Sequence, residues 1–345
     1  MEKLMSFPSH FCIQGRKVGN SAPCLIIAEA GVNHFGDMDK AFRLVDLAVD
    51  GGADVFKIQH FYTDRLIGET APEWRERMRP KELSEPDVLR IKEYCDRRGI
   101  IFMCTPHDDR AFQYLHEQLN VPAFKIGSGE VENWPFLKKV AKTGKPVILS
   151  TGMYEIAQIR EAVRLFAENN CSALAVLHCV TNYPAEPKSI NLKVMNQIRE
   201  FFTGPVGYSD HTAGTAVPLA AVALGASIIE KHITLDRDVP NAQDWKVSCD
   251  PSNFRTFVDQ VREIEAALGG TPKFIGTDEK ASVRWARKSL HAAADIHAGE
   301  VLLESSFVAQ RPGTGISPAR LGEFVGRRAL VDIRVGTIID PGMIG

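Results

Sequence analysis

The chain has 345 residues, of which 44% are hydrophobic and 24% charged, and its formal net charge is -2. This composition is typical of a globular protein, and the lack of a basic stripe argues against a nucleic-acid partner. Residues 1–20 lack the pattern of a signal peptide, and no apolar run reaches the ~18 residues that a membrane span needs. Seven cysteines are scattered without a C-x-x-C pair. We therefore expect reduced thiols and a cytoplasmic protein that engages neither membrane nor nucleic acid.

Short apolar segments rich in Val, Ile and Phe alternate along the chain with longer amphipathic segments. Alternation of this kind predicts a parallel sheet, and continuous apolar strands are typical of a sheet covered on both faces. Eight strand–helix units within about 235 residues predict a closed (β/α)₈ TIM barrel. The predicted strands are residues 25–31, 55–59, 100–106, 123–128, 146–152, 174–180, 205–210 and 228–235.

A doubly wound open sheet is the alternative fold, and it usually carries a G-x-G-x-x-G turn after its first strand. Residues 29–34 read EAGVNH there, so this fingerprint is absent. Before the first strand, residues 11–23 carry a Gly-Arg-Lys turn between apolar flanks, which favours a hairpin that plugs the barrel floor. We assign residues 1–270, with this hairpin, to the barrel domain.

The character of the sequence changes after residue 270. Residues 271–283 contain Pro and Gly and are interpreted as a linker, and residues 284–345 as a small, mostly β domain with short strands between glycine turns. Within the barrel, the connection at residues 60–85 is unusually long and charged. We favour a solvated excursion there, and a lid over the catalytic face is the alternative.

Ionisable or polar groups stand at the ends of all eight predicted strands, where barrel enzymes place their catalytic residues. Two lysines, Lys57 and Lys125, lie within apolar strands, and a buried charge is costly unless it is paired. A structural ion pair would satisfy each lysine. Nearby hydroxyl groups favour instead a cradle for a phosphate or carboxylate; they belong to Thr105, Ser128, Ser150 and Ser209.

His211 and His232 end adjacent predicted strands, which lie about 5 Å apart in a sheet. Two neutral imidazoles at this separation can share a divalent ion and leave positions open for water and substrate, which favours Mn²⁺, with Mg²⁺ as the alternative. A strand lysine also permits a Schiff-base aldolase, which requires a desolvated lysine and no metal. The histidine pair and the many anion-binding groups argue against that mechanism.

The strand-end segments resemble the sialic acid synthase family. The matching segments are IAEAGVNH at 27–34, KIGSGE at 125–130, LSTGM at 149–153, GYSDHT at 207–212 and EKH at 230–232. The segments ADIHAGE at 294–300 and RPGTG at 311–315 resemble the antifreeze-like (SAF) domain of that family. The resemblance runs from about residue 12 to residue 345 and implies an enzyme that condenses phosphoenolpyruvate with an N-acetylated amino-sugar aldehyde. The expected products are a nine-carbon α-keto acid and phosphate.

The resemblance also implies roles for individual residues. Mn²⁺ would be held by His211 and His232, and Arg311 would reach the sugar site of a second protomer in a domain-exchanged homodimer. Glu130 matches a residue beside the reacting carbons. Positions that contact the sugar or a metal-bound water molecule match Glu29, Tyr183 and Asp244. Positions that contact phosphoenolpyruvate match Lys57, Thr105, Lys125, Ser128, Ser150 and Ser209.

Two segments depart from the family pattern, and both lie on the sugar side. Residues 241–246 are one residue longer than the usual Gly-Pro-Asp-His-Lys, and residues 180–182 read Val-Thr-Asn. The sequence therefore supports the reaction type better than the identity of the sugar. The alternatives are the same chemistry on a sugar that leads to pseudaminic or legionaminic acid, and a non-catalytic carbohydrate-binding barrel.

Overall fold

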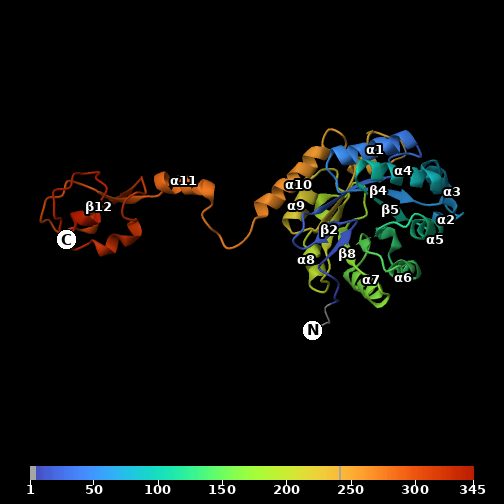
Figure 1. The fold of residues 1–345 in the computed structure, drawn as a ribbon, viewed down its shortest axis with the longest axis horizontal. Coiled ribbons are helices and arrows are strands. Elements are labelled where there is room, and N and C mark those ends of the chain that lie inside the picture. The colour runs from blue at the N-terminus through green and yellow to red at the C-terminus, as the bar shows by residue number, and fades with distance from the viewer. Residues whose placement is uncertain (1–4, 241) are drawn as a thin grey trace. The chain divides into compact units, whose positions relative to one another are not determined.

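The computed structural model describes residues 5–240 and 242–345, and the chain divides after Gly269 into two compact units (Figure 1). The first unit contains eight parallel strands that follow one another around a nearly closed barrel, as predicted. β5 and β6 lie side by side at the seam, where the described residues form no ladder. The strands are β3 (Leu25–Gly31), β4 (Val55–His60), β5 (Ile101–Pro106), β6 (Phe124–Ile126), β7 (Val147–Ser150), β8 (Leu174–Cys179), β9 (Val206–Asp210) and β10 (Ile228–His232).

Helices follow the strands and cover the outside of the barrel (Figure 1). α4 shows how the sequence sets their ends: the Ser84 hydroxyl accepts a hydrogen bond from the Asp87 amide, and Gly99 ends the helix in the left-handed conformation at φ 72°. The helices are α1 (Met38–Asp50), α2 (Thr63–Leu66), α3 (Pro72–Met78), α4 (Glu85–Arg98), α5 (Asp109–Gln113), α6 (Trp134–Ala141), α7 (Ile156–Glu168), α8 (Val194–Arg199), α9 (Ala216–Ala223) and α10 (Phe254–Leu268).

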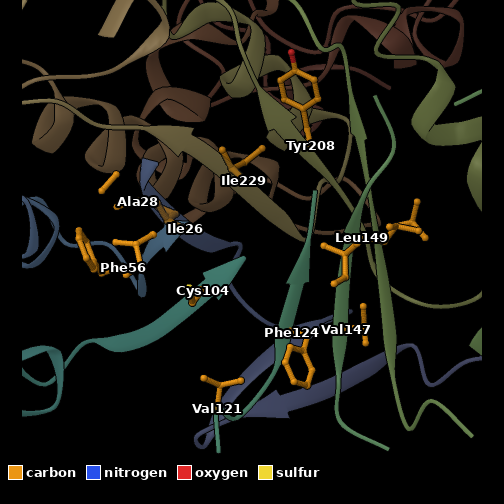
Figure 2. Packing of buried hydrophobic residues seen from close by; sticks show 14 of the residues in the cluster. Ile26, Ala28, Phe56, Cys104, Val121, Phe124, Val147, Leu149, Tyr208 and Ile229 are labelled. Atoms are coloured by element: carbon orange, nitrogen blue, oxygen red, sulfur yellow. The ribbon is translucent and has the colours of Figure 1, made fainter. Parts of the chain in front are cut away.

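Each barrel strand buries both of its faces, which explains the continuous apolar runs. Along β3, Ile26 and Ala28 belong to the core between strands and helices, whereas Leu25 and Ile27 belong to the core inside the barrel. Figure 2 shows the first of these cores, with Phe124 and other side chains that leave the strands on their outer surface. The side-chain alternation thus separates a helix-facing layer from an interior layer.

An antiparallel hairpin closes the interior at the end where the strands begin. β1 (His10–Ile13) pairs with β2 (Arg16–Gly19), as expected for residues 11–23. Phe11, Ile13 and Val18 pack into the same apolar cluster as the first residues of the barrel strands. The barrel is therefore plugged at its floor, and its polar residues gather at the opposite mouth.

The second unit spans Gly270–Gly345 and has an apolar core of its own, which includes Leu290, Ile296 and Ile333. β11 (Ser289–Ala292) pairs antiparallel with β12 (Phe307–Gln310), and isolated bridges join further short segments. This is the small, mostly β domain that the glycine-punctuated sequence predicts. Part of the interval interpreted as a linker is helical, because α11 (Thr277–Ala286) begins inside it.

Within residues 5–240 and 242–345, no helix combines the length and the apolar character that a membrane crossing needs.

The hairpin offers a test of how much the floor contributes to stability. Ile13 is fully buried and Cys12 beside it is exposed. Replacing Ile13 by Ala removes buried methyl groups and leaves a cavity, so we expect Ile13→Ala to lower the free energy of unfolding by about 2–5 kcal/mol. Cys12→Ala is the matched control and should change it by about 0.5 kcal/mol or less. Urea unfolding measures both variants, and equal stability of the two would show that the hairpin does not support the barrel.

Candidate active site

A cavity of about 130 Å³ opens at the carboxyl ends of the barrel strands. It is lined by polar and ionisable side chains from all parts of the ring, in contrast to the apolar interior below. Most of the residues that the sequence singles out meet here: Glu29, Lys57, Thr105, Lys125, Ser128, Ser150, Tyr183, Ser209, His211 and His232.

The centre of the cavity is a buried cluster of two lysines and two glutamates. Lys57 forms an ion pair with Glu29 and lies 3.6 Å from a carboxylate oxygen of Glu230. Lys125 lies 3.5 Å from the other oxygen of Glu230. Each lysine therefore has a carboxylate partner, as the structural ion pair requires, and the anion cradle stays a prediction. The formal charges of the four side chains cancel.

Hydroxyl groups surround the two ammonium groups. Lys57 donates to the Thr105 hydroxyl over 3.1 Å, and Lys125 donates to the Ser150 hydroxyl over 2.7 Å. Ser209 donates to Glu230 over 3.0 Å, while the Ser128 oxygen accepts from the Gly152 amide over 2.8 Å. These short contacts hold the donors in place before any ligand arrives, which is the preorganisation that anion binding requires.

Glu29 and Glu230 respond differently to burial. Burial raises the pKa of Glu29 to about 7, although Lys57 opposes the shift. Burial also acts on Glu230, but Lys125 and Lys57 outweigh it and hold the pKa of Glu230 below its usual range. Near neutral pH, Glu29 is thus the carboxyl of the cluster that changes its charge.

The two predicted metal ligands face each other above this cluster. The rings of His211 and His232 lie 5.4 Å apart, and the Tyr183 hydroxyl lies 2.8 Å from Nε2 of His211. Nδ1 of His211 lies 2.8 Å from the Val180 carbonyl oxygen, which fixes that nitrogen as a donor. Nδ1 of His232 is buried with no hydrogen-bond partner among the described residues.

A second buried ion pair fixes the strands that carry the histidines. Lys231 lies between Glu230 and His232 but points to the opposite side of β10, where its ammonium donates to Asp210 over 2.5 Å. The same ammonium donates to the carbonyl oxygens of Thr212 and Gly214. This clamp joins β10 to the loop after His211, and both of its charges are fully buried.

Three of the predicted residues lie outside the lining of the central cavity. Asp244 lies next to His232, with 4.0 Å between its carboxylate oxygen and Nδ1 of the His232 ring. Glu130 accepts a hydrogen bond from Asn133 over 2.6 Å and lines a neighbouring cavity of about 440 Å³, which His107 also lines. Arg311 belongs to the second unit, where its guanidinium lies 5.1 Å from the centre of the Trp285 ring.

Sequence reasoning missed several participants. Glu230 stood among the strand-end groups without an assigned role. Its place two residues before His232, on the same face of the strand, could have indicated that it lines the mouth. Cys179 and His107 also line the cavity. Nothing in the local sequence separates them from ordinary buried residues, because only the closure of the barrel brings them together.

The long connection at residues 60–85 is only partly the solvated excursion that we favoured. Helix α3 buries none of its side chains, and Trp74 is 59% exposed. The ends of the connection are different, because Thr63 is fully buried and Lys81 is 7% exposed. Backbone amides anchor the first end: Tyr62 donates to Asp108 and Thr63 to Glu82, each over 2.8 Å.

A barrel that is plugged at its floor, with a charge-balanced lysine–glutamate cluster, hydroxyl groups and two facing histidines at its mouth, is the architecture of a TIM-barrel enzyme, and here a small β domain follows it. Residues 44–273 match the model of the NeuB family, and residues 287–345 match the SAF domain. The chain belongs to the NeuB family.

Similar proteins cover nearly the whole chain. The N,N'-diacetyllegionaminic acid synthase of Campylobacter jejuni is 38% identical, over 91% of this chain and 98% of its own length. The human N-acetylneuraminate-9-phosphate synthase is 34% identical, over 92% of each chain. The crystal structure of N-acetylneuraminic acid synthetase from Leptospira borgpetersenii, in complex with citrate, superimposes with a TM-score of 0.74 at 32% identity. The superposition covers 82% of this chain and 97% of the Leptospira chain.

The titration of Glu29 predicts a pH dependence for anion binding in the cluster. The raised pKa means that Glu29 is largely protonated below about pH 7 and ionised above it. An ionised Glu29 competes with an incoming anion for Lys57, so we expect the Kd for phosphoenolpyruvate, measured by calorimetry in the presence of a chelator, to rise from pH 6.5 to pH 8.5.

The Glu29→Gln variant separates this effect from the titration of the ligand itself. Its amide cannot ionise, so its Kd should be lower than that of the unmodified protein at pH 8.5 and should not rise over this range. A rise of the same size in both proteins would contradict the role of Glu29.

Proposed function

We propose that this protein condenses phosphoenolpyruvate with an N-acetylated amino-sugar aldehyde, of the N-acetylmannosamine type, to give a nine-carbon α-keto acid and inorganic phosphate. The observation that carries the proposal is the buried lysine–glutamate cluster, ringed by preorganised hydroxyl donors, directly below two facing histidines. A phosphate and a carboxylate need such donors, and an aldehyde needs an electrophilic site next to them.

The phosphoenolpyruvate end is assigned to the cluster itself. Lys57 and Lys125 supply two ammonium groups inside a barrel that would otherwise exclude a polyanion. The hydroxyl groups supply directional hydrogen bonds, and they come from Thr105, Ser128, Ser150 and Ser209. These groups hold the enol carbon that forms the new bond at a fixed distance from the histidines, which converts a bimolecular encounter into a positioned one.

The histidine pair fits a divalent ion, for which we propose Mn²⁺, with Mg²⁺ as the alternative. Burial and the neighbouring His211 hold the pKa of His232 well below its usual range, so this ring is neutral and can give an electron pair to a metal ion. No described residue forms a hydrogen bond with its Nδ1. Burial alone would lower the pKa of His211, but the Cys179 sulfur raises it to about 9, so His211 would release a proton on binding a metal.

Among the described residues, no cluster of three or more His, Cys, Asp or Glu side chains has metal-binding geometry. A site with only two protein ligands leaves most positions to water and substrate. When bound there, a divalent ion supplies Lewis acidity at the aldehyde oxygen.

The remaining steps are assigned to residues around the two sites. After the C–C bond forms, a water molecule adds to the former enol carbon, and the tetrahedral intermediate loses phosphate. We assign to Glu130 the orientation of that water, because burial raises the pKa of this carboxyl group and because His107 lines both its cavity and the central cavity. Glu29, Tyr183 and Asp244 border the histidines and are assigned to the sugar hydroxyls and to metal-bound water.

Phosphate release tests the reaction directly. The protein is incubated with phosphoenolpyruvate, Mn²⁺ and a panel of N-acylated aldoses that includes N-acetylmannosamine and the precursors of legionaminic and pseudaminic acid. We expect release with at least one sugar, its loss with a chelator and its recovery with Mn²⁺. The substrate that supports release identifies the acceptor among these alternatives.

Variants of the histidine pair sharpen this test. Replacing both His211 and His232 by Ala should abolish release, whereas His297→Ala, at a side chain that is 83% exposed, should leave it unchanged. Unaffected release in the double variant would exclude the metal assignment. Borohydride trapping of a lysine adduct would favour a Schiff-base aldolase, and the absence of both phosphoenolpyruvate binding and release would favour a carbohydrate-binding barrel.

We further propose that Arg311 completes the sugar site of a second protomer in a domain-exchanged homodimer. Its Nε donates to the Ala286 carbonyl oxygen over 3.0 Å, and its guanidinium lies over the Trp285 ring. These contacts hold the arginine on an exposed surface of the small unit, with no carboxylate partner among the described residues. A preorganised, unneutralised guanidinium is suited to sugar oxygens brought by another chain.

Subunit mixing tests this exchange. Arg311→Ala and Lys125→Ala should each be inactive, but dimers re-formed from an equal mixture should regain about a quarter of the activity, because half are heterodimers with one intact composite site. If Arg311 served its own barrel, both sites of every heterodimer would be defective and the mixture would stay inactive.

A further inference from the structure

The motif at residues 27–34 contributes more to the barrel mouth than the carboxyl group of Glu29. β3 is irregular between Glu29 and Gly31, where its register against β4 shifts, and Gly31 has a φ of 55°. A Cβ atom on Gly31 would lie 2.8 Å from Oδ2 of Asp244 and 3.4 Å from the His232 ring. The glycine therefore leaves the space that the Asp244 carboxylate occupies beside His232.

Asn33, two residues further along the motif, joins the two chain segments that carry His232 and Asp244. Asn33 is 3% exposed, and its side-chain amide donates to the Ile233 carbonyl oxygen over 2.9 Å and to the Ser248 hydroxyl oxygen over 3.2 Å. Ile233 follows His232 at the end of β10, and Ser248 follows the 3-10 turn that begins at Asp244. Both N–H groups of the Asn33 side chain are thus used to link these segments.

The link reaches Asp244 through a further hydrogen bond. The Ser248 hydroxyl donates to the Asp244 carbonyl oxygen over 2.7 Å, so a relay runs from Asn33 through Ser248 to Asp244. The side chain of Asp244 is itself 20% exposed, which leaves its carboxylate within reach of a ligand. A buried group that holds the backbone of such a carboxylate is suited to positioning it, because a small displacement changes how the carboxylate meets its ligand.

We propose that Asn33 is a positioning residue that fixes the Asp244 carboxylate, through Ser248, where it accepts hydrogen bonds from hydroxyl groups of the aldose. The inference rests on the proposed function, in which Asp244 belongs to the sugar side of the site. The lysine–glutamate cluster has separate anchors in Thr105 and Ser150, so loss of Asn33 should weaken sugar binding and spare phosphoenolpyruvate. An asparagine that only stabilised the fold would not act on one substrate alone.

The test compares steady-state kinetics of the whole protein at saturating Mn²⁺, with the sugar that supports phosphate release. Asn33→Ala removes both donors, and we expect the KM for the sugar to rise about 3- to 10-fold, which is the effect of one or two lost hydrogen bonds. The KM for phosphoenolpyruvate should not change.

Ser248→Ala breaks the relay at its second member and should also raise the KM for the sugar alone, which keeps the proposal testable if Asn33→Ala does not fold. The double variant should have the same KM for the sugar as Asn33→Ala, because both changes interrupt one relay. Two effects that multiply in the double variant would contradict a relay through Ser248.

Asn169 provides the matched control. It is half-buried at the end of α7, far along the chain from the motif, and its side-chain amide donates to the Leu165 carbonyl oxygen over 2.8 Å. Asn169→Ala should leave both KM values unchanged. An unchanged sugar KM in Asn33→Ala and Ser248→Ala, or an equal rise in both KM values, would overturn the assignment.

A failure of the proposed function is recognised separately. If the unmodified protein releases no phosphate with any sugar of the panel, the reaction is wrong, and the relay is then judged by hydrogen–deuterium exchange, which needs no substrate. Faster exchange at residues 244–249 in Asn33→Ala, with unchanged exchange at residues 125–150, supports the positioning role. Unchanged exchange at residues 244–249, or faster exchange in both segments, overturns it.

Discussion

The rest of the site depends on one constraint, which is that four buried charges must balance at the mouth of an apolar barrel. Lys57 and Lys125 can stay charged there because Glu29 and Glu230 form ion pairs with them. An isolated buried ammonium would lose its proton or destabilise the fold. The balance also limits the ligand, since an entering anion disturbs it unless one carboxyl takes up a proton. Glu29, with its raised pKa, is suited to that role.

A second buried pair, on the opposite surface of the same strands, keeps this arrangement rigid. Glu230 and His232 point into the mouth, whereas Lys231 between them points outward to Asp210. The alternation of a β-strand therefore lets one short segment supply a cluster residue, a clamp residue and a candidate ligand. Because the clamp binds carbonyl oxygens of the loop after His211, the spacing of the two histidines does not depend on a ligand being present.

Much of the fold follows from local sequence, and the limits of that prediction have physical causes. Continuous apolar runs predict the barrel strands because both strand faces are buried, and strand ends predict Lys57 or His232 because parallel strands end at one rim. The sequence could not show that Lys81 is buried while Trp74 is exposed, because their connection is charged throughout and only contact with the loop after β3 separates them. The resemblance placed Glu130 beside the reacting carbons, but the sequence could not show that it lines a neighbouring cavity, because this depends on the 3-10 turn from Ser128 to Glu130.

The plugged floor has a consequence for the order in which ligands enter. Along β9 and β10, Ser209 and Glu230 precede His211 and His232 by two residues, so these two side chains lie one layer deeper than the histidines. Phe11, Ile13 and Val18 of the hairpin fill the barrel below, so the described residues close this end with apolar side chains. If a ligand occupies each layer, the ligand of the lower layer can enter and leave through the mouth only while the upper layer is empty.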